Sequence, residues 1–124
     1  MRVVSQKCND ELVRYCNIPF ESTGFIVTKE DDHYKILAHV YGDEQPYYLG
    51  SYKKEEHAIF VLRSFEAFNT IAGTVYLPPE KVLLDSFNAV GKGMIEGTLT
   101  EEEAIEEAKR LFTTNYWLGG KDIV

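Results

Sequence analysis

The sequence has 124 residues, of which 44% are hydrophobic and 27% charged, and its formal net charge is −7. This length fits a single domain, residues 1–124, with a core of its own, and the composition excludes a disordered chain. The acidic charge argues against extended nucleic acid as a partner, because DNA and RNA binding depends on a basic face. No apolar run approaches the ~20 residues of a membrane span, so we expect no membrane partner.

The first half of the sequence predicts β-strands. Segments rich in β-forming residues alternate with charged or glycine-containing turns, at residues 2–5, 24–28, 34–41 and 47–52. The connections are short, so consecutive strands are expected to pair antiparallel as a meander.

A helix is predicted from about residue 55 to residue 68. Its apolar residues recur every three or four positions, at Ala58, Val61, Leu62, Phe65 and Phe68. Ile59 and Phe60 lie off this stripe, which indicates that the helix packs on the sheet and also on a further element or a second subunit. Residues 69–73 are predicted to end it.

The second half predicts two more helices. An extended segment at residues 74–77 leads to Pro78 and Pro79, which suit the start of a helix over residues 80–90. The segment 91–93, Gly-Lys-Gly, is predicted to break that helix. Thr100 and Glu103 have the spacing of a capping box, which opens the third helix. The expected fold class is therefore α+β, with an antiparallel meander of about four strands in the N-terminal half and two to three helices in the C-terminal half.

Signatures of catalysis and metal binding are missing from the sequence. The three histidines show neither an HxxxH spacing nor Cys/His clustering, and there is no GxSxG motif. Gly91-Lys92-Gly93 lacks the residues of a nucleotide-triphosphate loop, although a flexible basic turn facing an anion stays open. We expect no enzymatic activity, no metal and no cofactor.

The cysteines and the N-terminus indicate the compartment. Cys8 and Cys16 have no CxxC spacing, and the first residues lack the apolar run of a signal peptide. A chain of this size does not need a disulfide. We therefore expect reduced thiols and a location in the cytoplasm.

Aromatic residues make up 13% of the chain. Tyrosines on the solvated face of a sheet explain most of them. Phe60, Phe87, Tyr116 and Trp117 fit that explanation less well, because they lie at helix edges or beyond a helix end. Such rings stack on nucleobases for ~1–3 kcal/mol each, and they serve equally well as anchors of a subunit interface.

Several segments in the first 70 residues resemble small phage and prophage proteins of Gram-positive bacteria. They are Met-Arg-Val-Val-Ser-Gln at 1–6, Ile-Pro-Phe-Glu at 18–21, Ile-Leu-Ala-His-Val-Tyr-Gly at 36–42, Tyr-Leu-Gly-Ser-Tyr at 48–52 and Glu-Glu-His-Ala at 55–58. With its acidic charge, its length and its helical second half, the chain resembles the Thoeris anti-defence protein family, type one. The resemblance implies a viral sponge in the bacterial cytoplasm that holds a cyclic ADP-ribose signal, or in some members a cyclic oligonucleotide, without degrading it. It also implies a homodimer or larger oligomer with pockets at subunit boundaries.

Six residues are candidates for binding such a small nucleotide-derived signal. An adenine needs stacking surfaces and a pyrophosphate needs cationic donors, which arginine supplies better than lysine. We predict stacking by Phe87, Tyr116 and Trp117, phosphate binding by Arg63 and Arg110, and a contact from Asn88 to a base or ribose edge. For the arginines, a surface position or pairing with a helix dipole is the other explanation.

A second hypothesis is an acidic protein–protein inhibitor that mimics DNA and blocks a host nucleic-acid-binding enzyme. Its interaction surface would be the glutamate cluster at 101–103 and 106–107. A solvated helix start explains the same cluster. A third is a virion or regulatory accessory protein without a ligand.

Overall fold

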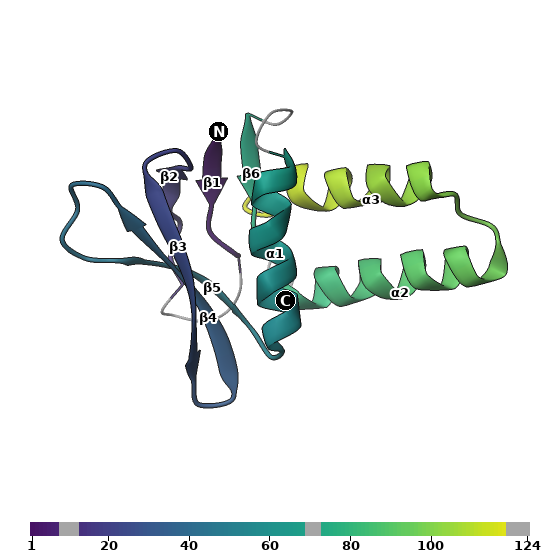
Figure 1. Ribbon diagram of the computed structural model, residues 1–124, viewed down its shortest axis with the longest axis horizontal. Helices are drawn as coiled ribbons and strands as arrows, with labels where there is room; N and C mark the ends of the chain where they lie inside the picture. The colour runs from purple at the N-terminus through teal and green to yellow at the C-terminus, as the bar shows by residue number, and fades with distance from the viewer. Residues whose placement is uncertain (8–12, 69–72, 119–124) are drawn as a thin grey trace.

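The computed structural model describes residues 1–7, 13–68 and 73–118 (Figure 1). Within them the chain forms six strands and three helices: β1 Arg2–Val4, β2 Asn17–Pro19, β3 Thr23–Glu30, β4 His33–Val40, β5 Tyr47–Tyr52, α1 Glu55–Phe68, β6 Thr74–Tyr76, α2 Glu80–Glu96 and α3 Glu101–Thr113. The predicted α+β class is confirmed. Cys8 and most of the predicted helix end at 69–73 lie outside the described residues.

The predicted meander is confirmed for β3, β4 and β5, which form one antiparallel sheet in that order. β3 and β4 pair along their whole length, from Thr23 opposite Val40 to Glu30 opposite His33. The turn between them is tight because Asp31 adopts a φ of 54°, in the left-handed region that aspartate tolerates better than most residues. A register shift at Ile36 and Leu37 offsets β5 against β4.

The prediction that the first strand joins the meander is wrong. β1 is the middle strand of a second sheet, antiparallel to β2 and parallel to β6, where Val3 lies opposite Ile18 and Val75. Reasoning from short connections pairs only neighbours along the chain. It therefore missed a strand whose partner follows α1.

The side chain of Gln6 joins the two sheets. Its Nε2 donates hydrogen bonds to the carbonyls of Ser51, at 3.2 Å, and Pro78, at 3.3 Å, and its Oε1 accepts one from the Ser51 N–H at 3.1 Å. Gly50 leaves room for this amide, because a Cβ there would lie 2.7 Å from the Cβ of Gln6. The buried amide therefore links the backbone of β5 to the chain just after β6 by hydrogen bonds.

α1 covers the inner face of the meander, and its predicted apolar stripe is confirmed. Ala58, Val61 and Phe65 are buried against a core that includes Ile36 and Leu49. The predicted second contact of α1 is also present, because its Phe60 faces α2 and α3. The Phe60 ring centroid lies 4.9 Å from that of Phe87 and 5.9 Å from that of Phe112.

The prediction that α2 ends at Gly91-Lys92-Gly93 is wrong. These three residues are helical, so they do not form a flexible basic turn. α2 continues to Glu96 and ends at Gly97, whose φ of 72° suits a left-handed cap. The N–H groups of Thr98 and Leu99 both donate to the Gly93 carbonyl, so the chain turns back just beyond these glycines. The predicted capping box of Thr100 and Glu103 is confirmed at the start of α3.

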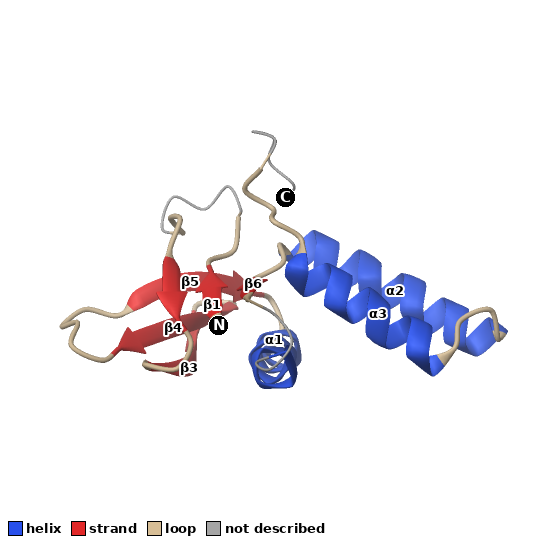
Figure 2. Cartoon of the chain, turned by 90° about the horizontal axis from the view of Figure 1, so that it is seen from above, coloured by secondary structure: helices blue, strands red, loops and turns tan. Residues whose placement is uncertain are grey.

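α2 and α3 form a helical hairpin, called the arm below, that projects away from both sheets (Figures 1 and 2). The buried residues of the arm are Leu83 in α2 and Leu111 and Phe112 in α3, all near its base. Towards the tip, Met94 is 51% exposed and Ile95 is 89% exposed.

Candidate binding site

A pocket of about 410 Å³ lies where the arm meets α1. We call it the aromatic pocket, and it is lined by Phe60, Ser86, Phe87, Val90, Gly91, Ala104, Ala108 and Leu111. None of these side chains ionises, and Phe60 meets Phe87 edge to face, with 78° between the ring planes. A neutral lining with aromatic rings suits a flat, weakly polar group.

His57 lies behind Phe87, which the sequence did not indicate. Its ring centroid is 5.5 Å from that of Phe87, and its Nδ1 is buried without a hydrogen-bond partner among the described residues. The Oε1 of Glu80 lies 4.0 Å from this nitrogen and accepts a hydrogen bond from the Lys53 N–H at 3.1 Å. The imidazole thus packs as an aromatic neighbour that helps to hold the Phe87 ring.

Of the two arginines predicted to bind phosphate, Arg63 lies on the helix that contributes Phe60 to this pocket. It follows Phe60 by three positions on α1, so the two side chains leave the same side of the helix. Arg63 is exposed and makes no hydrogen bond or ion pair with any described residue. Asn88 follows Phe87 directly and is exposed, so its side chain turns about 100° away around α2.

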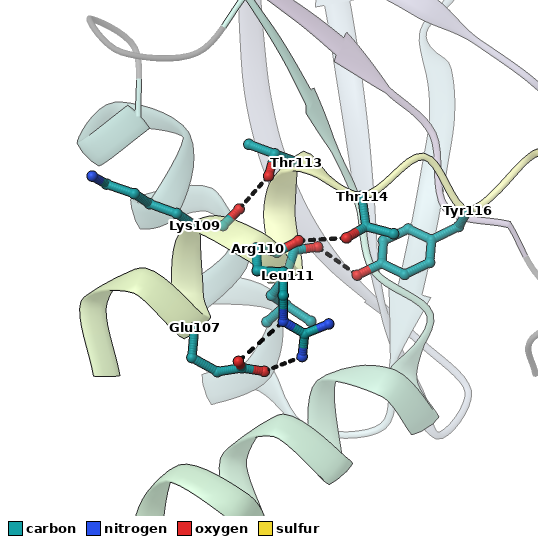
Figure 3. A network of polar contacts seen from close by, with 7 residues as sticks. All are labelled: Glu107, Lys109, Arg110, Leu111, Thr113, Thr114 and Tyr116. Atoms are coloured by element: carbon teal, nitrogen blue, oxygen red, sulfur yellow. Dashed lines mark hydrogen bonds and ion pairs between the residues drawn. The ribbon is translucent and has the colours of Figure 1, made fainter. Parts of the chain in front are cut away.

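Arg110 lies on the other side of the arm, where it is already paired. Its guanidinium donates to both carboxylate oxygens of Glu107, with Nε 3.1 Å from Oε2 (Figure 3). This contact raises the pKa of Arg110. A groove of about 850 Å³ beside it is lined by four glutamates, Glu102, Glu103, Glu106 and Glu107. A phosphate would meet net negative charge there, so the geometry gives the predicted phosphate role of Arg110 no support.

Tyr116 is part of the core rather than of an open stacking surface. It is 4% exposed, and its hydroxyl donates to the Leu111 carbonyl (Figure 3). Burial raises the pKa of Tyr116 to about 12. A small cavity of about 240 Å³ touches both Tyr116 and Arg110. The ring has little free face on which a base could stack.

Trp117 lies at a third place, beside the end of β1. Its indole N–H donates to the Ser5 carbonyl at 2.9 Å, and its ring meets Tyr15 edge to face at 5.4 Å. The Nζ of Lys7 lies 6.0 Å from the Trp117 ring. This residue fastens the segment after α3 to the N-terminal strand.

A single chain therefore does not gather the six predicted residues into one site. Phe87 lines the aromatic pocket with Arg63 one helical turn from its wall, whereas Arg110 and Tyr116 share a small cavity and Trp117 lies apart. Sequence reasoning missed Gly91, Ala104 and Ala108 of the pocket. The four-residue spacing of the two alanines was the available signal that they share a helix face.

The described residues offer no group of three His, Cys, Asp or Glu side chains that could hold a metal ion. Within the same part of the chain, no helix has the length and apolar character needed to cross a bilayer.

Known proteins offer no match. No protein family, no curated protein and no solved structure is detectably similar to this chain. The resemblance to the Thoeris anti-defence proteins therefore stays a prediction.

Proposed function

We propose that the protein is a non-catalytic binding protein that holds the flat base of a nucleotide-derived signal in the aromatic pocket and sequesters it. The observation that supports this most is a neutral pocket of about 410 Å³ with two phenylalanine rings in its wall. Arg63, three positions from Phe60 on α1, is exposed and has no partner among the described residues. Small-molecule sites are typically of about 300–1,000 Å³ with mainly apolar walls and a few polar groups that orient the ligand.

The chemistry of this site favours retention of the ligand over its conversion. A base packed against Phe60 and Phe87 gains ~1–3 kcal/mol from each stacking contact. Arg63 supplies the forked donor that suits a phosphate oxygen pair. Ser86 contributes a hydroxyl to the lining, and no ionisable side chain of the lining stands beside it as a general base.

We take a cyclic ADP-ribose isomer as the leading candidate for the signal, with a cyclic oligonucleotide as the second. The resemblance suggests this class, and both molecules combine bases with phosphates, the groups for which the pocket and Arg63 are suited. Sequestration of such a signal in the host cytoplasm, by a homo-oligomer, would make the protein an anti-defence factor of a phage or prophage.

The test is thermal unfolding with and without ligand. A ligand at about 100 times its Kd adds about 2.7 kcal/mol to the free energy of unfolding, which raises Tm by several degrees. We expect this rise with a cyclic ADP-ribose isomer, and mass spectrometry after heat denaturation should return the ligand unaltered. Absence of any shift with cyclic ADP-ribose isomers, cyclic oligonucleotides and ADP-ribose would refute the proposal.

Two pairs of variants locate the site. Phe87→Ala and Arg63→Ala should each weaken binding about tenfold or more, because each removes an interaction of at least ~1.4 kcal/mol. Asn88→Ala and Arg110→Ala are the matched controls, since both residues are exposed and neither lines the aromatic pocket. If Arg110→Ala weakens binding and Arg63→Ala does not, the ligand lies in the groove on the other side of the arm.

The acidic inhibitor remains a second candidate because of the surface of α3. Glu101, Glu102, Glu103 and Glu106 are all exposed, and four carboxylates line one groove. Lys109 pairs with Glu106 and Arg110 with Glu107, which neutralises part of this charge. A host DNA-binding enzyme that binds the wild type at low salt, but not a variant with Glu102→Lys and Glu103→Lys, would favour this function.

A further inference from the structure

One side of the arm is apolar and uncovered. Helical spacing places six residues there, which we call the apolar face of the arm: Phe87, Gly91, Met94, Ile95, Ala104 and Ile105. No residue from Leu84 to Arg110 is buried. Met94, Ile95 and Ile105 are 51%, 89% and 50% exposed, an unusual density of large apolar side chains on a solvated surface.

The arm lacks the packing that stabilises helices in most proteins. Helices in water are marginal on their own, and they owe most of their stability to burial of an amphipathic face. In α2 and α3 this face is present, but the chain itself covers it only near the base. Another molecule on the apolar face would supply the missing burial.

Gly91 points to a close neighbour at the middle of this face. A glycine inside a helix is unfavourable relative to alanine, and a Cβ built at Gly91 meets nothing within 4 Å. The chain itself therefore does not require glycine at this position. Gly93 is different, because a Cβ there would lie 2.8 Å from the Cβ of Leu99. Close approach of another backbone is a general reason for glycine in a helix.

We propose that the arm of a second copy of this chain packs on the apolar face, so that two arms form an antiparallel four-helix bundle around a two-fold axis near Gly91. Gly91 lies midway between Phe87 and Ile95, four positions from each. A two-fold axis there therefore brings Ile95 of each copy to Phe87 of the other. The paired arms bury all four helices on two sides, as in other four-helix bundles.

Charge favours a second copy on this face. The six residues of the apolar face are uncharged, with Glu101 one turn before Ala104 and Ile105 on α3, whereas the groove on the other side of the arm is lined by four glutamates. In the antiparallel contact the two Glu101 side chains lie at opposite ends, so two chains that each carry a net charge of −7 can meet at the apolar face without bringing these carboxylates together. Two copies meeting at the acidic groove would repel each other.

The size of the face fits a dimer that dissociates on dilution. α2 has 17 residues and is therefore roughly 25 Å long, and two helices of ~10 Å diameter lie side by side. The footprint is roughly 500 Å² per copy, or about 1,000 Å² in total, at the lower limit for specific interfaces. The same contact closes the open side of the aromatic pocket, and this last point rests on the proposed function. Dimer formation itself requires no ligand.

Sedimentation velocity across a wide range of concentrations, without ligand, tests the proposal. The wild type should pass from the mass of one chain to that of two as the concentration rises. Ile95→Glu, at a position exposed in the single chain, should remain monomeric with an unchanged circular dichroism spectrum. Leu118→Glu is the control, because Leu118 is 73% exposed but lies outside the arm, and it should dimerise like the wild type.

Gly91→Ala separates the dimer from a purely local role of this residue. In the dilute monomer the alanine favours the helix and should raise the urea midpoint, whereas it should weaken the dimer at least tenfold by keeping the two α2 helices apart. A wild type that is monomeric at every concentration overturns the proposal. So does a dimer that Ile95→Glu and Gly91→Ala leave unchanged. A wild type that dimerises but binds none of the nucleotide-derived ligands would count against the proposed function alone.

Discussion

Replacement of Gln6 by leucine tests how the two sheets are held together. The Gln6 side chain is buried and bonds to both backbone groups of Ser51 and to the Pro78 carbonyl. The Pro78 carbonyl keeps a second donor, the Tyr52 hydroxyl at 2.6 Å. Leucine therefore leaves two backbone groups of Ser51 without partners, at a cost of about 1–3 kcal/mol each. We expect a loss of about 3 kcal/mol.

Urea unfolding followed by circular dichroism measures this loss. A domain of this size has a free energy of unfolding of about 5–15 kcal/mol, so the change is a large fraction of the total. At about 4 °C per kcal/mol, the Tm should fall by about 12 °C. Gln45→Leu makes the same change at an exposed position, and its free energy of unfolding should stay within about 0.5 kcal/mol of the wild-type value. A loss below about 1 kcal/mol for Gln6→Leu would show that the amide does not join the sheets.

Two further predictions concern Gly50 and Tyr116. Gly50→Ala should cost about 1–3 kcal/mol in urea unfolding, because its Cβ would lie 2.7 Å from the buried Gln6 Cβ. Gly24→Ala, where nothing lies within 4 Å of the new Cβ, should be near neutral. The pKa of Tyr116 is raised from 10.0 to about 12, so its contribution to stability is complete below pH 10 and is lost as the pH rises through 12. Unfolding free energies should therefore fall over this range more steeply for the wild type than for Tyr116→Phe, and parallel curves would contradict this.

The elements that the sequence predicts well are those whose signals are local. β5 at residues 47–52 and the capping box at Thr100 depend on neighbouring residues, and both appear as expected. The pairing of β1 with β6 depends on strands far apart in the chain, which no local pattern reveals. Helix α2 passes through Gly91 and Gly93 because a glycine weakens a helix by only about 1 kcal/mol.

The candidate site was predictable only in part. Phe87 lines a pocket because a helix edge has a fixed direction relative to its core face, and that direction can be worked out from spacing. Tyr116 and Trp117 follow the end of α3. Beyond a helix end no regular spacing exists from which the orientation of a side chain could be predicted. The ion pair between Arg110 and Glu107 could have been predicted from the sequence, because the two residues lie three positions apart on α3.

The central position of β1 has a consequence for the order of folding. The meander needs only two short turns to form, whereas β1 acquires its neighbour on one side only when Thr74 reaches Arg2. Closing so long a loop costs entropy before it brings any contact, so the β2-β1-β6 sheet should form late and limit the folding rate. Until then β1 presents unpaired backbone groups along one edge. Chains truncated before residue 74 should therefore aggregate through that edge.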